Sequence, residues 1–159
     1  MPEVIELTRK DSALLEEVYN GLYLETFTKE TEIEALDDWQ KRLGKHKGKK
    51  PQQHFYVMKD EGNLIAFVVT EYYPQSKTML LNYAVKTKDT NLSAKPLVEH
   101  ATSAHQTNMI FWEGHNPPPQ SYGYQPVNID YIQGDINGSG EAHGLTLYAK
   151  GGSGKDLKN

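Results

Sequence analysis

The segment LIAFVV (residues 64–69) constrains the fold most, because apolar side chains occupy both of its alternating faces. Successive side chains of a β-strand point to opposite faces of the sheet. A strand that is apolar on both faces has to be covered on both sides, so the segment predicts a central strand. The preceding run HFYVMK is predicted to pair with it as a hairpin, since Gly62 and Asn63 suit the positive φ angles of a tight turn.

The N-terminal third of the chain predicts one strand and two helices. Residues 4–8 alternate apolar and polar side chains, as a half-buried strand does. The first helix is predicted to begin at Asp11 or Ser12, residues that can cap a helix. Thr31 and Glu34 have the spacing of a capping box, and a stripe of apolar residues follows them, which predicts a second helix.

The remainder of the chain continues the sheet. TMLLNYAV (78–85) reads as a third consecutive strand, a helix capped by Ser93 follows, and NMIFWE (108–113) is a further strand. Three consecutive prolines exclude a regular helix from residues 114–123, which are predicted to be a loop before two closing strands. This order predicts an α+β fold: a mixed, mostly antiparallel sheet with helices on both faces.

Composition predicts one domain over residues 1–150, followed by a polar, disordered tail over 151–159. The formal net charge of -4 gives no basis for broad attraction to nucleic acid or an anionic membrane. The sequence contains no cysteine, and its six histidines lack metal-ligand spacing, so no metal cofactor is expected. A reducing, cytoplasmic location is expected, and the exposed edge of the final hairpin is compatible with a homodimer.

The predicted order of elements resembles the GNAT superfamily of acyl-CoA N-acyltransferases over about residues 4–150. ETFTKETEIEALDDWQKRL is similar to the second helical region of many members, FYVMKDEGNLIAFVV to their second and third strands, and LLNYAV to their fourth. GYQPVNIDYIQ with GLTLYAK is similar to the closing pair of strands. The resemblance implies a GNAT-like fold and an N-acetyltransferase or other acyltransferase. Such an enzyme moves an acyl group from acetyl-CoA or another acyl-CoA to an amine of a small molecule or peptide.

The family motif Q/R-x-x-G-x-G/A aligns here with DTNLSA (89–94), before the helix that starts with KPLVEHA. Glycine in this motif lets the backbone approach the CoA pyrophosphate at a helix N-terminus. In this sequence Asp89 stands at the Arg or Gln position, and Leu92 replaces the first glycine. The resemblance implies that the pyrophosphate is held by Asn91, Leu92, Ser93, Ala94 and Lys95. It implies pairing of the pantetheine arm with the backbone of Asn82, Tyr83, Ala84 and Val85.

Candidate catalytic residues follow from the same resemblance. Many members carry a Glu on the fourth strand as general base, and Asn82 occupies that position here. Transfer to an amine requires a proton acceptor, for which Glu71 at the end of the third strand is the first candidate and Glu25 on the first helix the second. The usual helix with the tyrosine that protonates the thiolate is replaced by a loop, in which Tyr122 or Tyr124 is the candidate acid.

Two alternatives remain open at this point. The Arg, Gly, Glu and Tyr positions of the family all differ in this sequence, which fits a catalytically inactive GNAT-like domain that binds a ligand or protein partner in the same cleft. The other alternative keeps transferase activity but uses an acyl carrier protein as donor, because such a donor depends less on contacts to the nucleotide.

Overall fold

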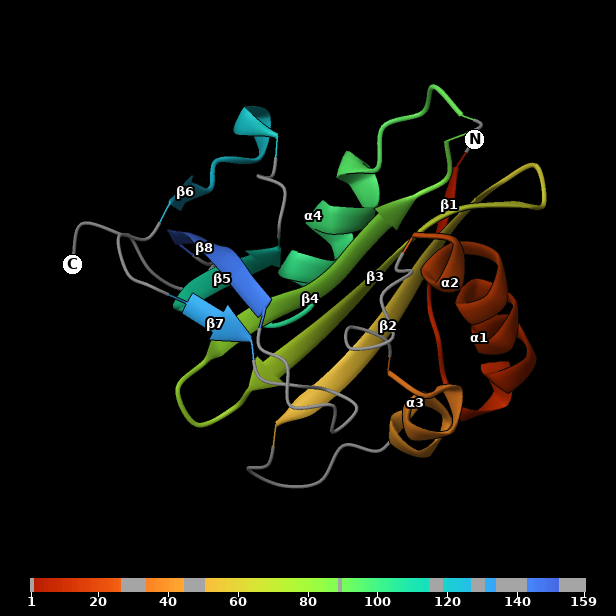
Figure 1. Cartoon of the computed structure of the whole chain (residues 1–159), viewed down its shortest axis with the longest axis horizontal. Coiled ribbons are helices and arrows are strands. Elements are labelled where there is room, and N and C mark those ends of the chain that lie inside the picture. The colour runs from red at the N-terminus through yellow and green to blue at the C-terminus, as the bar shows by residue number, and fades with distance from the viewer. Residues whose placement is uncertain are drawn as a thin grey trace.

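The computed structural model describes residues 2–26, 34–44, 51–88, 90–114, 119–126, 131–133 and 143–151. The strands form a sheet in the order β1-β2-β3-β4-β5-β8-β6, with β7 paired to β8 (Figure 1). Neighbouring strands are antiparallel except β4 and β5, which are parallel. The strands are β1 (Glu3–Glu6), β2 (Gln52–Asp60), β3 (Asn63–Tyr73), β4 (Thr78–Lys86), β5 (Met109–Gly114), β6 (Gln125–Pro126), β7 (Tyr131–Gln133) and β8 (His143–Gly151).

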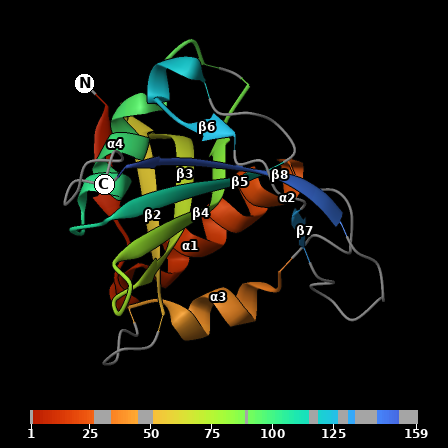
Figure 2. The same cartoon turned by 90° about the vertical axis from the view of Figure 1, so that its left-hand side faces the viewer.

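Helices cover both faces of the sheet (Figures 1 and 2). α1 (Ser12–Val18), α2 (Leu24–Thr26) and α3 (Leu36–Arg42) lie on one face, called here the α1–α3 face. α4 (Lys95–Ser103) lies on the opposite face, called the α4 face. The π-helical turn Tyr19–Tyr23 joins α1 to α2. The predicted α+β class, with a mixed and mostly antiparallel sheet between helices, is confirmed.

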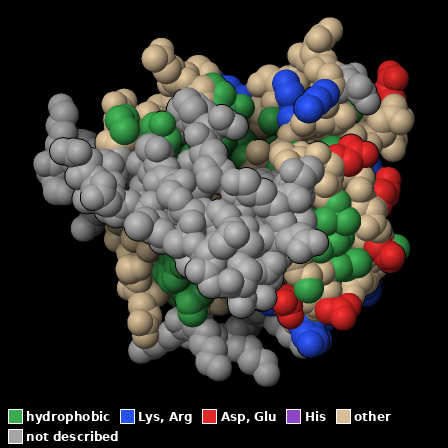
Figure 3. Space-filling view, in the orientation of Figure 1, with side chains coloured by type: hydrophobic (Ala, Val, Ile, Leu, Met, Phe, Trp, Pro, Cys, Tyr) green, Lys and Arg blue, Asp and Glu red, His purple; other side chains and the backbone are tan. Residues whose placement is uncertain are grey.

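The strand β3 is buried on both faces, as predicted from its two apolar faces. Phe67 and Val69 pack with α1 and α3 in the core of the α1–α3 face. Ala66 and Val68 pack with α4 in the core of the α4 face. All four side chains are at most 2% exposed, so this strand separates two hydrophobic cores. Figure 3 shows acidic side chains, with some hydrophobic ones between them, over the side of the molecule where α1 and α3 lie.

The β2–β3 hairpin is confirmed, but its turn lies one residue earlier than predicted. Glu61 and Gly62 take the positive φ angles, 51° and 81°, and Asn63 already begins β3. Two consecutive positive φ angles suit the twist of a tight hairpin. The paired strands, rather than the preference of Asn63 for a turn, set the register.

The first helical segment begins earlier than predicted. Thr8 caps a 3₁₀ turn over Arg9–Asp11, and its Oγ1 accepts a hydrogen bond from the Lys10 N–H at 3.3 Å. Asp11 does not cap α1: its carboxylate accepts the Thr8 N–H at 2.7 Å. Thr8 and Asp11 form a capping box, in which each side chain accepts a hydrogen bond from a backbone N–H group at the start of the turn.

The segment after β5 contains a 3₁₀ turn over Gln120–Tyr122 and the short strand β6. Its described residues hold no longer helix, in agreement with the predicted loop, although residues 115–118 lie outside the description. Residues 152–159 of the predicted tail also lie outside it. Within the described ranges, none of the helices is long and apolar enough to cross a membrane.

Candidate functional site

The parallel strands β4 and β5 are paired over only part of their length. Thr78–Leu81 pairs with Met109–Trp112, and beyond Leu81 the strand β4 continues to Lys86 without a described partner strand on that side. The strand order leaves β3 as its neighbour on the other side. The backbone N–H and C=O groups along this edge of β4 are therefore available to an added strand or an extended ligand.

A β-bulge at Asn82 marks the point where the two strands part. On β3, the consecutive residues Val69 and Thr70 pair with Tyr83 and Leu81, so Asn82 is the extra residue of β4. A bulge bends its strand and increases the local twist. Leu81 packs in the core of the α4 face, whereas Tyr83 packs in the core of the α1–α3 face.

Asn82 also carries an unsatisfied acceptor. Its side-chain Oδ1 is buried and has no hydrogen-bond partner among the described residues. A buried polar atom without a partner costs free energy, and such atoms concentrate where a ligand or water completes the bonding. This acceptor, Asn82 Oδ1, belongs to the bulge residue, at the point where the pairing of β4 with β5 has ended.

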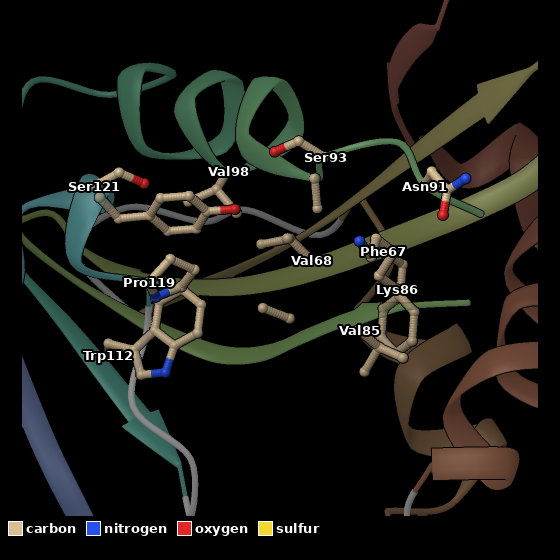
Figure 4. Close-up of a pocket in the computed structure, with 13 residues that line it drawn as sticks. Phe67, Val68, Val85, Lys86, Asn91, Ser93, Val98, Trp112, Pro119 and Ser121 are labelled. Atoms are coloured by element: carbon tan, nitrogen blue, oxygen red, sulfur yellow. The ribbon is translucent and has the colours of Figure 1, made fainter. Parts of the chain in front are cut away.

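A pocket of about 430 Å³ opens beside this edge. Figure 4 shows its lining residues converging from β3, β4, the start of α4, β5 and the segment at residues 119–122. Its walls are mostly apolar and include Val85, Val98, Trp112 and Tyr122. Lys86 is the only charged side chain among the described lining residues. An apolar pocket with few polar groups is the usual form of a ligand site.

The predicted donor-binding residues lie around this pocket, although not all of them line it. Asn82, Tyr83, Ala84 and Val85 lie on β4 beyond its pairing with β5, and Ala84 and Val85 line the pocket. The loop residues that line it are Asn91, Ser93 and Ala94, whereas Leu92 and Lys95 are not among its lining residues. Asp89 lies outside the described residues.

The loop before α4 satisfies part of its own backbone. The Leu92 N–H donates to Thr90 Oγ1 at 3.1 Å, and the Lys95 N–H donates to Ser93 Oγ at 3.1 Å. The Lys86 ammonium donates to the Leu92 carbonyl at 3.0 Å. Ser and Thr side chains commonly bind nearby backbone in this way. The Leu92 and Lys95 N–H groups are therefore already engaged in hydrogen bonds within the loop.

The two candidate tyrosines have different surroundings. Tyr122 lines the pocket with its hydroxyl against Ser93, and burial raises the pKa of that hydroxyl. Tyr124 is buried beneath it, with Trp112 at a ring-centroid distance of 5.6 Å and the Lys150 ammonium 4.9 Å from the centre of its ring. Burial also raises the pKa of Tyr124, and its hydroxyl has no described hydrogen-bond partner. Both hydroxyls are thus held neutral, and Tyr122 is the one that meets the pocket.

The two candidate carboxylates do not line the pocket. Glu71 pairs across the sheet with Leu80 on β4, two residues before the bulge, and accepts a hydrogen bond from Tyr73 at 2.5 Å. Glu25 is exposed on α2, which continues the first helical segment after the π-helical turn. Of the two, Glu71 lies nearer in register to Asn82.

A buried network around Glu34 was not predicted from the sequence. Glu34 Oε2 accepts hydrogen bonds from the Tyr83 hydroxyl at 2.7 Å and from Trp39 Nε1 at 3.2 Å, while Oε1 accepts one from Arg42 at 3.0 Å. The Tyr23 hydroxyl donates to Tyr83 at 3.3 Å and accepts the Glu34 N–H at 2.8 Å.

The network ties β4, beside its bulge, to the helices of the α1–α3 face. The helix predicted to begin with a Thr31–Glu34 capping box instead begins at Leu36 as α3, and Thr31 lies outside the described residues. The helical spacing of the aromatic residues in the first two helical segments indicated that they pack in the core, but it did not identify Glu34 as their hydrogen-bond partner.

No metal site accompanies these features within the described parts of the chain. They contain no group of three or more His, Asp or Glu side chains arranged to hold a metal ion.

Comparison with known proteins gives matches in structure and none in sequence. The sequence has no significant match to a protein-family model or to a curated protein. Among solved structures, a protein from Bacteroides thetaiotaomicron assigned to the GNAT family of acetyltransferases superposes with a TM-score of 0.70 at 16% identity. That alignment covers 99% of this chain and 90% of the other.

Two further structures align over nearly the whole of both chains. A protein from Staphylococcus epidermidis classed as an acetyltransferase has a TM-score of 0.67 at 11% identity, with 95% of this chain and 99% of that one covered. The ribosomal-protein-S18-alanine N-acetyltransferase from Escherichia coli has a TM-score of 0.64 at 12% identity, covering 100% and 99%. The chain therefore has the fold of the GNAT acyl-CoA N-acyltransferases.

Proposed function

We propose that this protein is an N-acyltransferase that moves an acyl group from a thioester donor of the acyl-CoA type to an amine of a small molecule or peptide. The observation that carries the proposal is the edge of β4 beyond its described pairing with β5, which starts at the Asn82 bulge and borders an apolar pocket. A pantetheine arm contains two amides, so it can pair with this edge as an added strand does.

The donor would lie along β4 with its thioester at the bulge. The backbone from Asn82 to Val85 pairs with the amides of the arm, and the side chains of Val85, Val98 and Trp112 cover its apolar parts. The loop at residues 91–95 would lie beyond the arm, next to the first phosphate.

The reaction needs a neutral amine and an acid for the sulfur. The amine nitrogen attacks the thioester carbonyl carbon, the carbon–sulfur bond breaks, the thiolate takes a proton, and the amine loses one. The buried Asn82 Oδ1 can accept a hydrogen bond from the amine and orient it, but an amide cannot take its proton. Glu71, through water, is our first candidate for that acceptor, with Glu25 the second.

Tyr122 is our candidate for the acid that protonates the thiolate, ahead of Tyr124. Its hydroxyl is protonated at neutral pH, since the ordinary tyrosine pKa is 10.0 and burial raises the pKa of Tyr122 further, and the residue belongs to the pocket lining. Tyr124 is more deeply buried and does not line the pocket.

Thermal melting with and without millimolar acetyl-CoA tests the proposal. A ligand present at about 100 times its Kd stabilises the folded state by roughly 2.7 kcal/mol, so a clear rise in Tm is expected. Release of free thiol on addition of a panel of small amines and peptide N-termini then measures transfer. An unchanged melting temperature at saturating acetyl-CoA contradicts the proposal.

A second candidate function is binding without turnover. It is favoured by one observation: neither Glu71 nor Glu25 lines the pocket, and an amide occupies the position at the bulge. A thermal shift with acetyl-CoA but no thiol release with any amine would support this candidate over the transferase.

A further inference from the structure

We propose that donor recognition in this protein ends at the phosphopantetheine, so that the 3′-phosphoadenylate half of CoA, which carries the second phosphate of the pyrophosphate, adds little to binding. The ligand class is a thioester of phosphopantetheine, whether this arm belongs to CoA or to a carrier protein. The inference rests on the proposed function and concerns the far end of the same pocket.

The first argument is the state of the backbone donors before α4. A pyrophosphate at a helix N-terminus is held by several backbone N–H groups that are free to point at it. Here the Leu92 and Lys95 N–H groups already donate to Thr90 and Ser93 side chains. Pro96, in the first turn of α4, has no N–H at all. Two of the backbone donors before α4 are therefore already engaged, and a third position has none.

The second argument is the way Leu92 holds the loop. Its side chain is half-buried against the core of the α4 face, and its carbonyl accepts the Lys86 ammonium at 3.0 Å. To turn the backbone toward an anion would remove both contacts. The loop is thus fixed in its present form by packing as well as by hydrogen bonds.

The third argument is the charge around the pocket. The Lys95 ammonium lies 3.8 Å from the Glu99 carboxylate on the same helix, which partly neutralises it. Lys86 is the one charged side chain among the described lining residues. Among the described residues its ammonium has one hydrogen bond, to the Leu92 carbonyl, so two of its three N–H donors can point at one phosphate. One lysine matches one phosphate better than a pyrophosphate.

The fourth argument is the arrangement of polar side chains along the pocket. Tyr122 comes from the segment after β5, lines the pocket and lies against Ser93 at the start of α4. Figure 4 shows Ser121 and Ser93 on the α4 side of the pocket, with Lys86 and Asn91 at its other end. Lys86 therefore lies at the end of the pocket away from Ser121, which fits a phosphate beside that lysine and the thioester nearer Tyr122.

Calorimetric titration with three S-acetyl donors tests the inference: acetyl-CoA, acetyl-phosphopantetheine and acetyl-pantetheine. We expect the Kd values of the first two to agree within about fivefold, which is about 1 kcal/mol, and acetyl-pantetheine to bind at least about tenfold more weakly because it lacks the phosphate. Acetyl-CoA binding more than about fivefold tighter than acetyl-phosphopantetheine overturns the inference and leaves the proposed function intact. Binding of none of the three contradicts the proposed function itself.

A charge-removal variant identifies the phosphate partner. Lys86→Met should remove the difference between acetyl-phosphopantetheine and acetyl-pantetheine, because the phosphate then has no cation. Lys88→Met is the matched control: Lys88 is exposed, two residues further on, and is not among the lining residues. A phosphate preference that survives Lys86→Met contradicts the assignment of that lysine.

A gain-of-function variant tests whether the fixed conformation of the loop at residues 91–95 limits pyrophosphate binding, and this test does not depend on Lys86. Leu92→Gly frees the loop backbone and should improve acetyl-CoA binding by about tenfold relative to acetyl-phosphopantetheine, because the loop N–H groups can then turn toward the second phosphate. Leu92→Ala removes nearly the same apolar contacts without the backbone freedom of glycine and is the control. Equal ratios in the glycine and alanine variants would show that the loop does not limit pyrophosphate binding.

The source of the arm is separated by kinetics. Comparison of kcat/KM for one amine with acetyl-CoA and with an acetylated acyl carrier protein shows which carrier the enzyme uses. A higher value with the carrier protein assigns the arm to that protein and supports recognition without the nucleotide. A value with acetyl-CoA that exceeds those with both acetyl-phosphopantetheine and the carrier protein by more than about fivefold overturns the inference.

Discussion

The Tyr83 hydroxyl links the strand that borders the pocket to the helices of the α1–α3 face. It donates to the Glu34 carboxylate and accepts from the Tyr23 hydroxyl, and the Tyr83 side chain is 8% exposed. Burial is the largest cause that raises the pKa of Tyr83, and the neighbouring Glu34 charge adds to it. The residue therefore acts as a neutral donor inside the core.

Replacing this tyrosine with phenylalanine tests how much the network contributes to stability. Tyr83→Phe leaves the ring in place but removes one hydrogen bond from the partly buried Glu34 carboxylate and one from Tyr23. We expect the free energy of unfolding to fall by about 1–3 kcal/mol, the cost of leaving buried polar groups less satisfied. Urea denaturation followed by circular dichroism measures it.

The control for that measurement is a tyrosine with one hydrogen bond at the surface. The Tyr72 hydroxyl donates to the Gln106 carbonyl at an exposed position, so Tyr72→Phe should change the free energy of unfolding by about 0.5 kcal/mol or less. Equal losses in the two variants would mean that the Glu34 network contributes no more to the free energy of unfolding than a single surface hydrogen bond.

At the scale of the element, the bulge in β4 decides both the packing of the strand and the opening of the pocket. Without Asn82 the neighbouring pairs Leu81 with Thr70 and Tyr83 with Val69 become consecutive, as in a regular ladder. Side chains on both sides of the bulge would keep their present faces. The strand itself can therefore tolerate loss of this residue.

Deletion of Asn82 should separate folding from donor binding. We expect the deletion variant to fold, with the circular dichroism spectrum of the parent, and to lose the thermal shift with acetyl-CoA because β4 no longer bends away from β5. Asn82→Ala, which keeps the bulge, should retain a thermal shift. If the deletion variant still binds acetyl-CoA like the parent, the bulge does not create the site.

The elements also show how far sequence reasoning reaches. The apolar faces of β3, its hairpin with β2 and the loop in place of a helix were predicted, because each depends on local pattern and turn residues. The bulge was not: Leu81, Tyr83 and Val85 alternate like one face of a regular strand, yet they divide between two cores. Glu34 was interpreted as a helix cap because its partner Tyr83 lies 49 residues away.

The candidate site was predictable in position more than in detail. The resemblance indicated the loop at residues 91–95 and the strand end at residues 82–85. Of these, Ala84, Val85, Asn91, Ser93 and Ala94 line one pocket in the structure. Asn82, Tyr83, Leu92 and Lys95 are not among its lining residues. The engagement of the loop's own N–H groups depends on side-chain rotamers, which no periodicity in a sequence specifies.

On the scale of the whole molecule, buried tyrosines occupy both cores. Burial is the first cause in each case: it raises the pKa of Tyr23 from 10.0 to about 12, and it raises the pKa values of Tyr56, Tyr83 and Tyr124 as well. Tyr23 and Tyr83 belong to the core of the α1–α3 face, and Tyr56 and Tyr124 to that of the α4 face. Ionisation of these groups therefore opposes the packing of both faces at once.

The protein should lose stability in alkali. Above pH 10 the unfolded chain releases its tyrosine protons while the folded state keeps them, so the unfolded state binds fewer protons and the free energy of unfolding falls as pH rises. Each buried tyrosine contributes a slope of about 1.4 kcal/mol per pH unit between its unfolded and folded pKa values. Urea denaturation between about pH 8 and pH 11, with tyrosinate absorbance recorded in parallel, measures the slope.

Tyr83→Phe supplies the control, since it removes one of these protons. Its stability should fall less steeply above pH 10 than that of the parent protein, by about 1.4 kcal/mol per pH unit. Below pH 9 the two proteins should show parallel curves, because none of these tyrosines has yet begun to ionise in the unfolded chain. A parent protein whose free energy of unfolding is constant from about pH 9 to pH 11 would contradict burial of the four hydroxyls in a single cooperative fold.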